Sequence, residues 1–390
     1  MFEVEYRVLE TKSRYLYAQP LDGRGIERVW VSSPKRFIEN EILILGNVRR
    51  RDQGIQARVL ASRRDPTVLK VRPFQLREVT RGEYEFEDYP ADPDEAEDFE
   101  EALEVYRAGH LEEAADFLRD FLYRYPLHID SYHHLGNIDW KQGRLNRAIK
   151  YYEMGFRIGL LSLPSNFQGR LPWAHIGNRP FLRAAHAYAL LLNRSKRLLE
   201  ACKVCEQLLE WDPADHLGID ELLPRYYFDA RAPNLARSLL ERYGPHGMNS
   251  YTLALCLLLE GRRRDALRML CGAVTYNPYV FLFLLGERSA PELDVDTDYV
   301  TMGSEIEAAE YLADFGKYWS REPCLDFVRA LMHPNSPFRR RFDRFLQLKE
   351  QLECARDYPV RERLLAEQQA ILSGEDLRAL LREASDTIFG

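Results

Sequence analysis

Two groups of side chains in this sequence have the types that metal or redox chemistry needs. His128, His133 and His134 lie close together, and Cys202 and Cys205 form one C-x-x-C pair. Zinc ligands on a helix must face one point, whereas adjacent histidines diverge by about 100°. The cysteine pair lies within a helical pattern and has no second pair, which is typical of buried helix residues. We therefore predict no metal site and no redox pair.

The sequence also lacks the short motifs that mark common enzyme classes. It has no H-E-x-x-H, no Walker loop, no dinucleotide-binding glycine pattern and no G-x-S-x-G. We therefore expect a protein that is not an enzyme, binds no cofactor and has no small-molecule substrate.

A third group of side chains suits a ligand better than a reaction. The alternation of β-strands places one set on an outward face of two neighbouring strands: Tyr15, Tyr17, Arg28 and Trp30. Because rings stack on bases and cations attract phosphates, this face could bind single-stranded nucleic acid. The arginines that could follow the backbone are Arg49, Arg50 and Arg51. The alternative is that the rings pack on the rest of the protein, or reflect the preference of strands for Tyr and Trp.

The elements that hold these side chains read as a small β-barrel in residues 1–81. Alternation and turn signals predict short strands and, before the fourth, a brief helix: 2–9, 14–20, 27–32, 33–38, 42–49 and 55–62. This order is that of an OB-like barrel, and an SH3-like barrel is the close alternative. The region has 17 Lys and Arg against 10 Asp and Glu, a net +7 in a chain of net −7, which favours an anionic partner.

An acidic stretch follows the barrel. Between Gly82 and Glu101 the sequence has eleven acidic residues and no basic one. Like charges, together with Pro90 and Pro93, keep such a segment extended, so we assign residues 82–95 to an acidic linker. The alternative is a segment that folds back on the basic barrel.

Self-similarity is the strongest structural signal in the rest of the chain. Gly109 and Ala114 recur 34 residues later as Gly143 and Ala148. Small residues mark close helix crossings, and they predict a TPR-like α-solenoid over residues 96–334. The helix pairs are anchored at Ala114, Ala148, Ala201, Ala236 and Ala266, with an insert near 160–178 and a C-terminal helical cap or tail at 335–390.

In such repeats the first helix of each pair, the A helix, lines the concave face. Counting back from the anchors predicts a polar stripe there: Asp130, His133, Asn137, Trp140, Arg183, His186, Asn193 and Arg225. Asn137 can bind a peptide backbone, Trp140 can act as a hot spot, and Arg183 can pair with a carboxylate. The stripe predicts a groove for a protein partner, unless the chain's own C-terminal helices fill it.

From His175 to about Pro334 the chain resembles a bacterial family of tetratricopeptide-repeat proteins. The family's N-R-P-F-x-R-A segment stands here at 178–184, and its N-P-x-V…L-L-G segment stands at 277–286. The P-x-D-N-x-G-x-R segment departs from the family, with His216 for Asn and Asp220 for Arg. Similar N-R-P-F blocks look present in eukaryotic repeat proteins linked to ribosome-associated quality control. The resemblance implies the repeat fold and an interaction role, and it does not cover the barrel.

The sequence therefore predicts a multidomain α+β protein. A small N-terminal β-barrel, OB-like or SH3-like, is followed by an all-α TPR-like solenoid with C-terminal helices. With no secretory signal and no apolar run of about 20 residues, we expect a cytoplasmic protein. We expect a scaffold or adaptor that holds a protein partner in the groove as a subunit of a complex. The alternative is a single-stranded nucleic-acid (RNA) binding protein that uses the barrel, with the solenoid as its docking platform.

Overall fold

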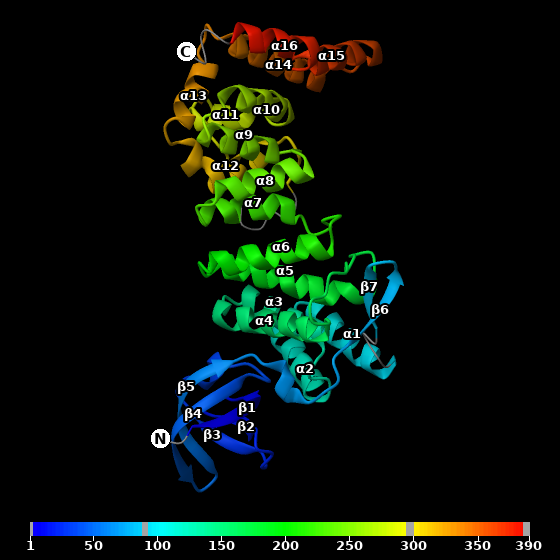
Figure 1. Ribbon diagram of the computed structural model, residues 1–390, viewed down its shortest axis with the longest axis vertical. Coiled ribbons are helices and arrows are strands. Elements are labelled where there is room, and N and C mark those ends of the chain that lie inside the picture. The colour runs from blue at the N-terminus through cyan, green and yellow to red at the C-terminus, as the bar shows by residue number, and fades with distance from the viewer. Residues whose placement is uncertain (1–2, 88–92, 294–299, 385–390) are drawn as a thin grey trace. The chain divides into compact units, whose positions relative to one another are not determined.

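The chain divides into two compact units, residues 1–219 and residues 220–390. The computed structural model describes residues 3–87, 93–293 and 300–384 (Figure 1). The first unit contains both the β-strands and the first helices, although we predicted a separate barrel. The predicted solenoid of residues 96–334 is therefore divided between the two units.

The first unit begins with a closed barrel in the order β1-β2-β3-β5-β4. β3 runs parallel to β5 and the other neighbours are antiparallel, with a 3-10 turn at Pro34–Arg36 between β3 and β4. This is the strand order of an OB-like barrel, which decides against the SH3-like alternative. The strands are β1 (Val4–Thr11), β2 (Leu16–Pro20), β3 (Glu27–Trp30), β4 (Ile42–Arg51) and β5 (Gly54–Arg63).

The barrel interior is filled by the residues that alternation placed inward. Leu16, Ala18 and Val29 are fully buried and pack with Leu43 and Leu45 of β4. The residues between them on β2 and β3 therefore point outward.

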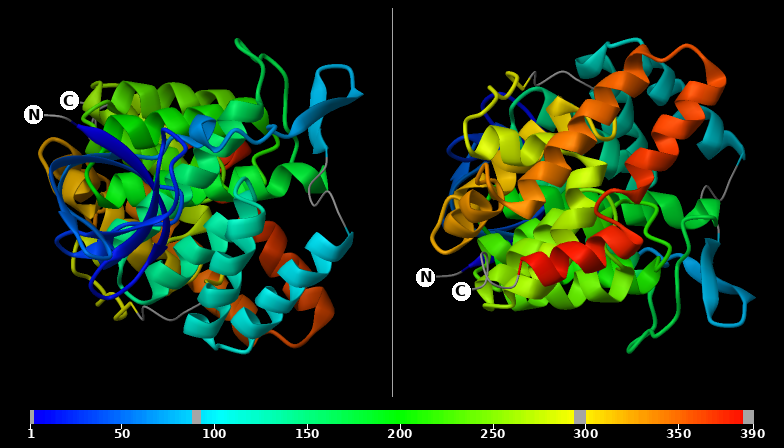
Figure 2. Two further views of the ribbon diagram at one scale, coloured as in Figure 1. Left: turned by 90° about the horizontal axis from the view of Figure 1, so that it is seen from below. Right: turned by 90° about the horizontal axis from the view of Figure 1, so that it is seen from above.

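A two-stranded hairpin of β6 (Gln75–Thr80) and β7 (Glu83–Glu87) follows the barrel. Figures 1 and 2 show it beside the start of the fifth helix rather than in the barrel. The Asn178 side chain accepts a hydrogen bond from the Phe86 N–H (3.2 Å) and donates one to the Tyr84 carbonyl (2.8 Å). The prediction of an extended acidic linker therefore does not hold for residues 83–87, and residues 88–92 lie outside the described residues.

The helices of the first unit form antiparallel pairs of the predicted kind. The anchors Ala114, Ala148 and Ala201 lie on the second helix of each pair and are fully buried. Gly136 lies against the Tyr152 ring, and an added Cβ would overlap that ring. The helices are α1 (Pro93–Arg107), α2 (Leu111–Arg124), α3 (Ile129–Lys141), α4 (Leu145–Ser162), α5 (Arg179–Arg194) and α6 (Leu198–Trp211).

The predicted insert near 160–178 is the loop between α4 and α5. Its Arg170 carbonyl accepts the Tyr84 N–H (2.9 Å), and Phe167 packs edge-on against the Tyr84 ring. The short 3-10 turn Ile176–Asn178 ends the loop. The insert thus holds the hairpin on the helices.

The second unit continues the helix pairs and then departs from them. The anchors Ala236 and Ala266 are fully buried on α8 and α10. In the part of the chain that the structure describes, no helix combines the length and apolar character that crossing a membrane requires. The helices are α7 (Ile219–Asp229), α8 (Pro233–Tyr243), α9 (Asn249–Leu259), α10 (Arg263–Tyr276), α11 (Tyr279–Leu284), α12 (Glu305–Trp319), α13 (Cys324–Leu331), α14 (Pro337–Cys354), α15 (Tyr358–Ala370) and α16 (Gly374–Glu383).

Buried charges join the barrel to the helices of the first unit. The Glu41 side chain is fully buried and accepts hydrogen bonds from the Ile38 N–H (3.1 Å) and from Lys150 Nζ (3.0 Å). Arg64 follows β5 and pairs with Glu153 of α4 at 2.7 Å. Burial lowers the pKa of Lys150, and the neighbouring Glu41 offsets part of that effect. We call these buried charges, together with Glu39 and its contacts described next, the seam.

The neighbouring Glu39 extends the seam to two further helices. Its Oε2 accepts a hydrogen bond from the Tyr151 hydroxyl at 2.5 Å, and its Oε1 lies 3.8 Å from Arg119 Nε of α2. Asn40 donates to the Tyr132 hydroxyl of α3 at 2.8 Å. Side chains of α2, α3 and α4 therefore all contact one short segment of the barrel.

We predict that Lys150→Ala lowers the free energy of unfolding by about 3 kcal/mol, because it leaves the buried Glu41 carboxylate without its nearest cation. Urea denaturation of the full chain measures this change. The double variant Glu41→Gln/Lys150→Met leaves no unpaired charge at this place, so its free energy of unfolding should fall much less.

The control is Lys203→Ala, which removes an exposed lysine from α6 and should leave the unfolding free energy nearly unchanged. Equal losses in the Lys150 and Lys203 variants would show that the seam does not stabilise the first unit.

Candidate functional site

Most of the predicted groove residues come together on α3 and α5 of the first unit. We define the A-helix face as His133, Asn137 and Trp140 of α3 with Arg183, His186 and Asn193 of α5. Arg183 Nη2 makes two hydrogen bonds to the Asp130 carboxylate, at 2.7 and 3.0 Å. The predicted Asp130 is itself buried and serves to hold Arg183.

A hydrogen-bonded network fixes the α3 side of this face. Asn137 Nδ2 donates to His133 Nε2 (3.0 Å), and Asn137 Oδ1 accepts from the Tyr152 hydroxyl (2.7 Å). The Trp140 ring lies edge-on to Tyr152, with centroids 6.3 Å apart. Since Nε2 of His133 accepts, its proton in the neutral form sits on Nδ1.

The network of the A-helix face is incomplete. These buried polar atoms of the face have no hydrogen-bond partner among the described residues: His133 Nδ1, Arg183 Nε and Asn193 Oδ1. A buried donor or acceptor left unpaired costs about 1–3 kcal/mol, so such atoms usually mark a strained, wet or ligand-binding place.

The histidines around this face are neutral at pH 7. Burial lowers the pKa of His128 to about 3 and also lowers the pKa of His133, His134 and His186. Each imidazole can therefore both donate and accept a hydrogen bond.

The structure does not bring Arg225 to an open face. Arg225 lies on α7 of the second unit and pairs with Asp314 of α12 at 2.8 and 2.9 Å. Phe315 of α12 packs against Phe228 of α7, with ring centroids 5.4 Å apart. The chain's own α12 therefore covers Arg225, which corrects the prediction that it lines a groove for a partner.

On the barrel, the predicted aromatic face does come together. The Tyr15 ring lies 5.4 Å from Tyr17 and 5.9 Å from Trp30, centroid to centroid. The Arg28 guanidinium lies 5.4 Å from the centre of the Tyr15 ring, and that of Arg51 lies 5.6 Å from the Trp30 ring. We keep the name aromatic face for Tyr15, Tyr17, Arg28 and Trp30.

The three consecutive arginines of β4 do not act together. Arg51 lies over Trp30, whereas Arg50 points elsewhere and pairs with Glu27 at 3.6 Å. Arg49 is exposed and stands opposite Gln56 in the β4–β5 register. Alternation along a strand separates neighbours in this way.

Sequence reasoning missed a cavity of about 600 Å³ beside Trp30. We call it the arginine cavity, because its charged lining residues are Arg14, Arg36, Arg51 and Arg58. These arginines come from separate segments of the chain, and barrel closure gathers them. The one sequence signal for this cavity was the period-2 alternation of β5, which puts Arg58 on the same face of the strand as Gln56.

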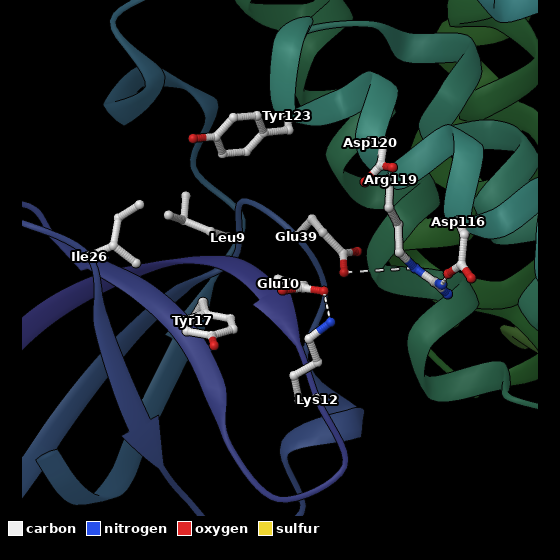
Figure 3. Close-up of a pocket in the computed structure, with 10 residues that line it drawn as sticks. All are labelled: Leu9, Glu10, Lys12, Tyr17, Ile26, Glu39, Asp116, Arg119, Asp120 and Tyr123. Carbon is white, nitrogen blue, oxygen red and sulfur yellow. Dashed lines mark hydrogen bonds and ion pairs between the residues drawn. The ribbon is translucent and has the colours of Figure 1, made fainter. Parts of the chain in front are cut away.

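A second cavity, of about 650 Å³, lies between the barrel and α2 (Figure 3). We call it the barrel–α2 cleft. Figure 3 shows an apolar side and a charged side, and Lys12 paired with Glu10 between them. The apolar side has Leu9, Tyr17, Ile26 and Tyr123; the carboxylates are Glu10, Glu39, Asp116 and Asp120. Tyr17 therefore borders carboxylates, while Trp30 borders arginines.

The barrel and the paired helices define a TPR-like helical-repeat protein with an added OB-like domain. The sequence model of the family described as "Transcriptional repressor TCF25" matches residues 100–380, so the chain belongs to the TCF25 family. The match is longer than the predicted resemblance and names a different family from the bacterial one expected. The TPR-like repeat fold is as predicted, and the barrel lies outside the match. No curated protein matches the chain.

Solved structures similar to this chain include several TPR proteins. YrrB, described as a TPR protein with an unusual peptide-binding site, is 16% identical and has a TM-score of 0.35; the match covers 44% of this chain and 81% of that chain. A tetratricopeptide-repeat protein from Parabacteroides merdae is 16% identical, with a TM-score of 0.36 and coverage of 70% and 98%. A structure of Naa15/Naa10 bound to HypK-THB is 16% identical, with a TM-score of 0.33 and coverage of 73% and 41%.

We predict that acid destabilises the first unit through its buried histidines. Their folded pKa values lie below the ordinary value of 6.5, so below pH 6.5 the unfolded chain takes up protons that the folded chain does not. Stability is therefore unaffected above about pH 7 and falls as the pH drops toward the folded pKa. His128, whose folded pKa is about 3, should alone remove about 2 kcal/mol between pH 7 and pH 5, measured by urea denaturation.

His128→Asn should make this pH dependence shallower, because Asn can replace the helix cap that His128 Nδ1 provides and does not titrate. The matched control is His110→Asn at the start of α2, where the side chain is exposed. If both variants keep the wild-type pH dependence, burial of His128 is not its cause.

Proposed function

We propose that the chain is a non-enzymatic adaptor that holds an extended segment of a protein partner on the A-helix face of α3 and α5. The observation that carries this proposal is the row of half-exposed polar side chains on that face, with His133, Asn137 and Arg183 held in fixed orientations by hydrogen bonds. Backbone carbonyl and amide groups of an extended segment are the groups that oriented imidazole, amide and guanidinium groups pair with.

The side chains at the edge of the face support a peptide ligand. Trp140 and Arg183 remain partly exposed, and Arg183 Nε is free of the pair that its Nη2 makes with Asp130. Trp and Arg are the residue types enriched at binding hot spots. In the second unit α12 covers the corresponding face, so the first unit offers the better site.

The family description, a transcriptional repressor, favours a partner that acts in transcription. Under this proposal the chain's contribution to such an assembly is binding, and the residues that matter are those of the A-helix face.

We predict that the double variant Trp140→Ala/Arg183→Gln loses at least tenfold of the partner captured from a native lysate, since it removes the hot-spot ring and the oriented cation. Quantitative mass spectrometry of the captured proteins, with and without nuclease, measures this loss. Capture that survives nuclease treatment is protein-mediated.

The matched control is Leu199→Ala/Lys203→Gln, which changes one exposed apolar side chain and one exposed cation on α6. Because Arg183→Gln removes the cation that pairs with the buried Asp130, the single variant Trp140→Ala, which keeps that pair, is measured as well, and its melting temperature must stay close to that of the wild type. Undiminished capture by the Trp140/Arg183 variant would mean that the partner binds elsewhere.

A further inference from the structure

We infer that the barrel binds single-stranded nucleic acid, with phosphates in the arginine cavity and bases on the aromatic face. This site goes beyond the proposed function, since its ligand and its elements differ from those of the A-helix face.

The charge of the arginine cavity is uncompensated. In the described part of the chain, none of its four arginines forms an ion pair, and no carboxylate lines the cavity. Three other arginines of the barrel are paired, Arg24 with Asp22, Arg50 with Glu27 and Arg63 with Glu5, so carboxylates are available in the barrel but not at this cavity. Four arginines that line one cavity without a counter-charge make it positive, and a polyanion is attracted to such a place.

The rings beside the cavity favour nucleic acid over other polyanions. Trp30 lines the cavity itself, and Tyr15 and Tyr17 continue from it with centroid spacings of 5.9 and 5.4 Å. An acidic peptide or an anionic lipid surface gains little from a row of aromatic faces. Bases stack on such faces whatever their sequence, so the expected binding has little sequence preference.

The barrel–α2 cleft limits where the phosphates can lie. Tyr17 borders this cleft, whose four carboxylates outnumber its two cations, Lys12 and Arg119, so that its net charge opposes a phosphate (Figure 3). Binding is therefore centred on Trp30 and Arg58 rather than on Tyr17. The Trp30 end of the aromatic row therefore lies beside positive charge, and the Tyr17 end lies beside net negative charge. This difference can be tested.

The test is fluorescence anisotropy of the full chain with a labelled single-stranded oligonucleotide of about 12 nucleotides, in salt from roughly 50 to 200 mM. We expect Trp30→Ala to weaken binding about tenfold, Trp30→Phe to retain most of it, and Tyr17→Ala to weaken it less than Trp30→Ala. Arg58→Gln should lower the slope of log affinity against log salt by about 0.7, the value for one phosphate contact on a single strand.

The matched control is Arg77→Gln, which removes an exposed arginine of β6 and should change neither affinity nor slope. Because Arg14 and Arg58 are exposed, their Gln variants should keep the wild-type melting temperature, so a loss of binding reports on the site.

Three results would overturn the inference. The first is no salt-dependent binding by the wild-type chain. The second is that Trp30→Ala and Arg77→Gln weaken binding equally, which would mean that the surface binds polyanions without using the ring. The third is equally strong competition by duplex DNA, by polyglutamate of matched charge or by anionic vesicles, each of which would assign the arginines to a different ligand.

Discussion

Glu39 and Glu41 are buried carboxylates on one short segment of the barrel, where Arg64 approaches only Glu41, at 3.6 Å, and the helices supply the closer partners. Taking a carboxylate out of water costs several kcal/mol unless cations and donors replace the lost hydration. Lys150 and Tyr151 of α4 supply those groups, together with Arg119 of α2. The seam therefore explains why the barrel and the first helices form one compact unit. It also holds the barrel against α2, where the barrel–α2 cleft opens.

Local patterns in the sequence predicted the elements well. Period-2 alternation gave the barrel and its inward residues, and the buried alanines gave the helix pairs. The acidic composition of residues 83–87 led to the prediction of a linker, although Tyr84 and Phe86 alternate with acidic residues as in a strand. This strand, β7, pairs with β6, and its backbone also bonds to Asn178, about ninety residues away, a contact that no local rule indicates. The division near residue 219 was also beyond sequence patterns, since the repeats continue across it.

The candidate sites were predicted only in part, for the same reason. Tyr15, Tyr17 and Trp30 lie on adjacent strands, so alternation was enough to place them together. Arg14, Arg36 and Arg58 meet only because the barrel closes, and Arg225 is covered by a helix about ninety residues later in the chain. Alternation also predicts that Arg50 points away from Arg49 and Arg51. The prediction that all three arginines follow one nucleic-acid backbone did not take this into account.

The family match begins at residue 100, after the barrel, yet the helix side chains of the seam lie inside the matched part. The helical part of this chain therefore carries groups whose polar partners lie in the barrel. If the helices were separated from the barrel, Lys150 Nζ would lose the Glu41 carboxylate and the buried Tyr151 hydroxyl would lose the Glu39 carboxylate. The two parts are thus matched to each other through groups that neither could leave buried and unpaired.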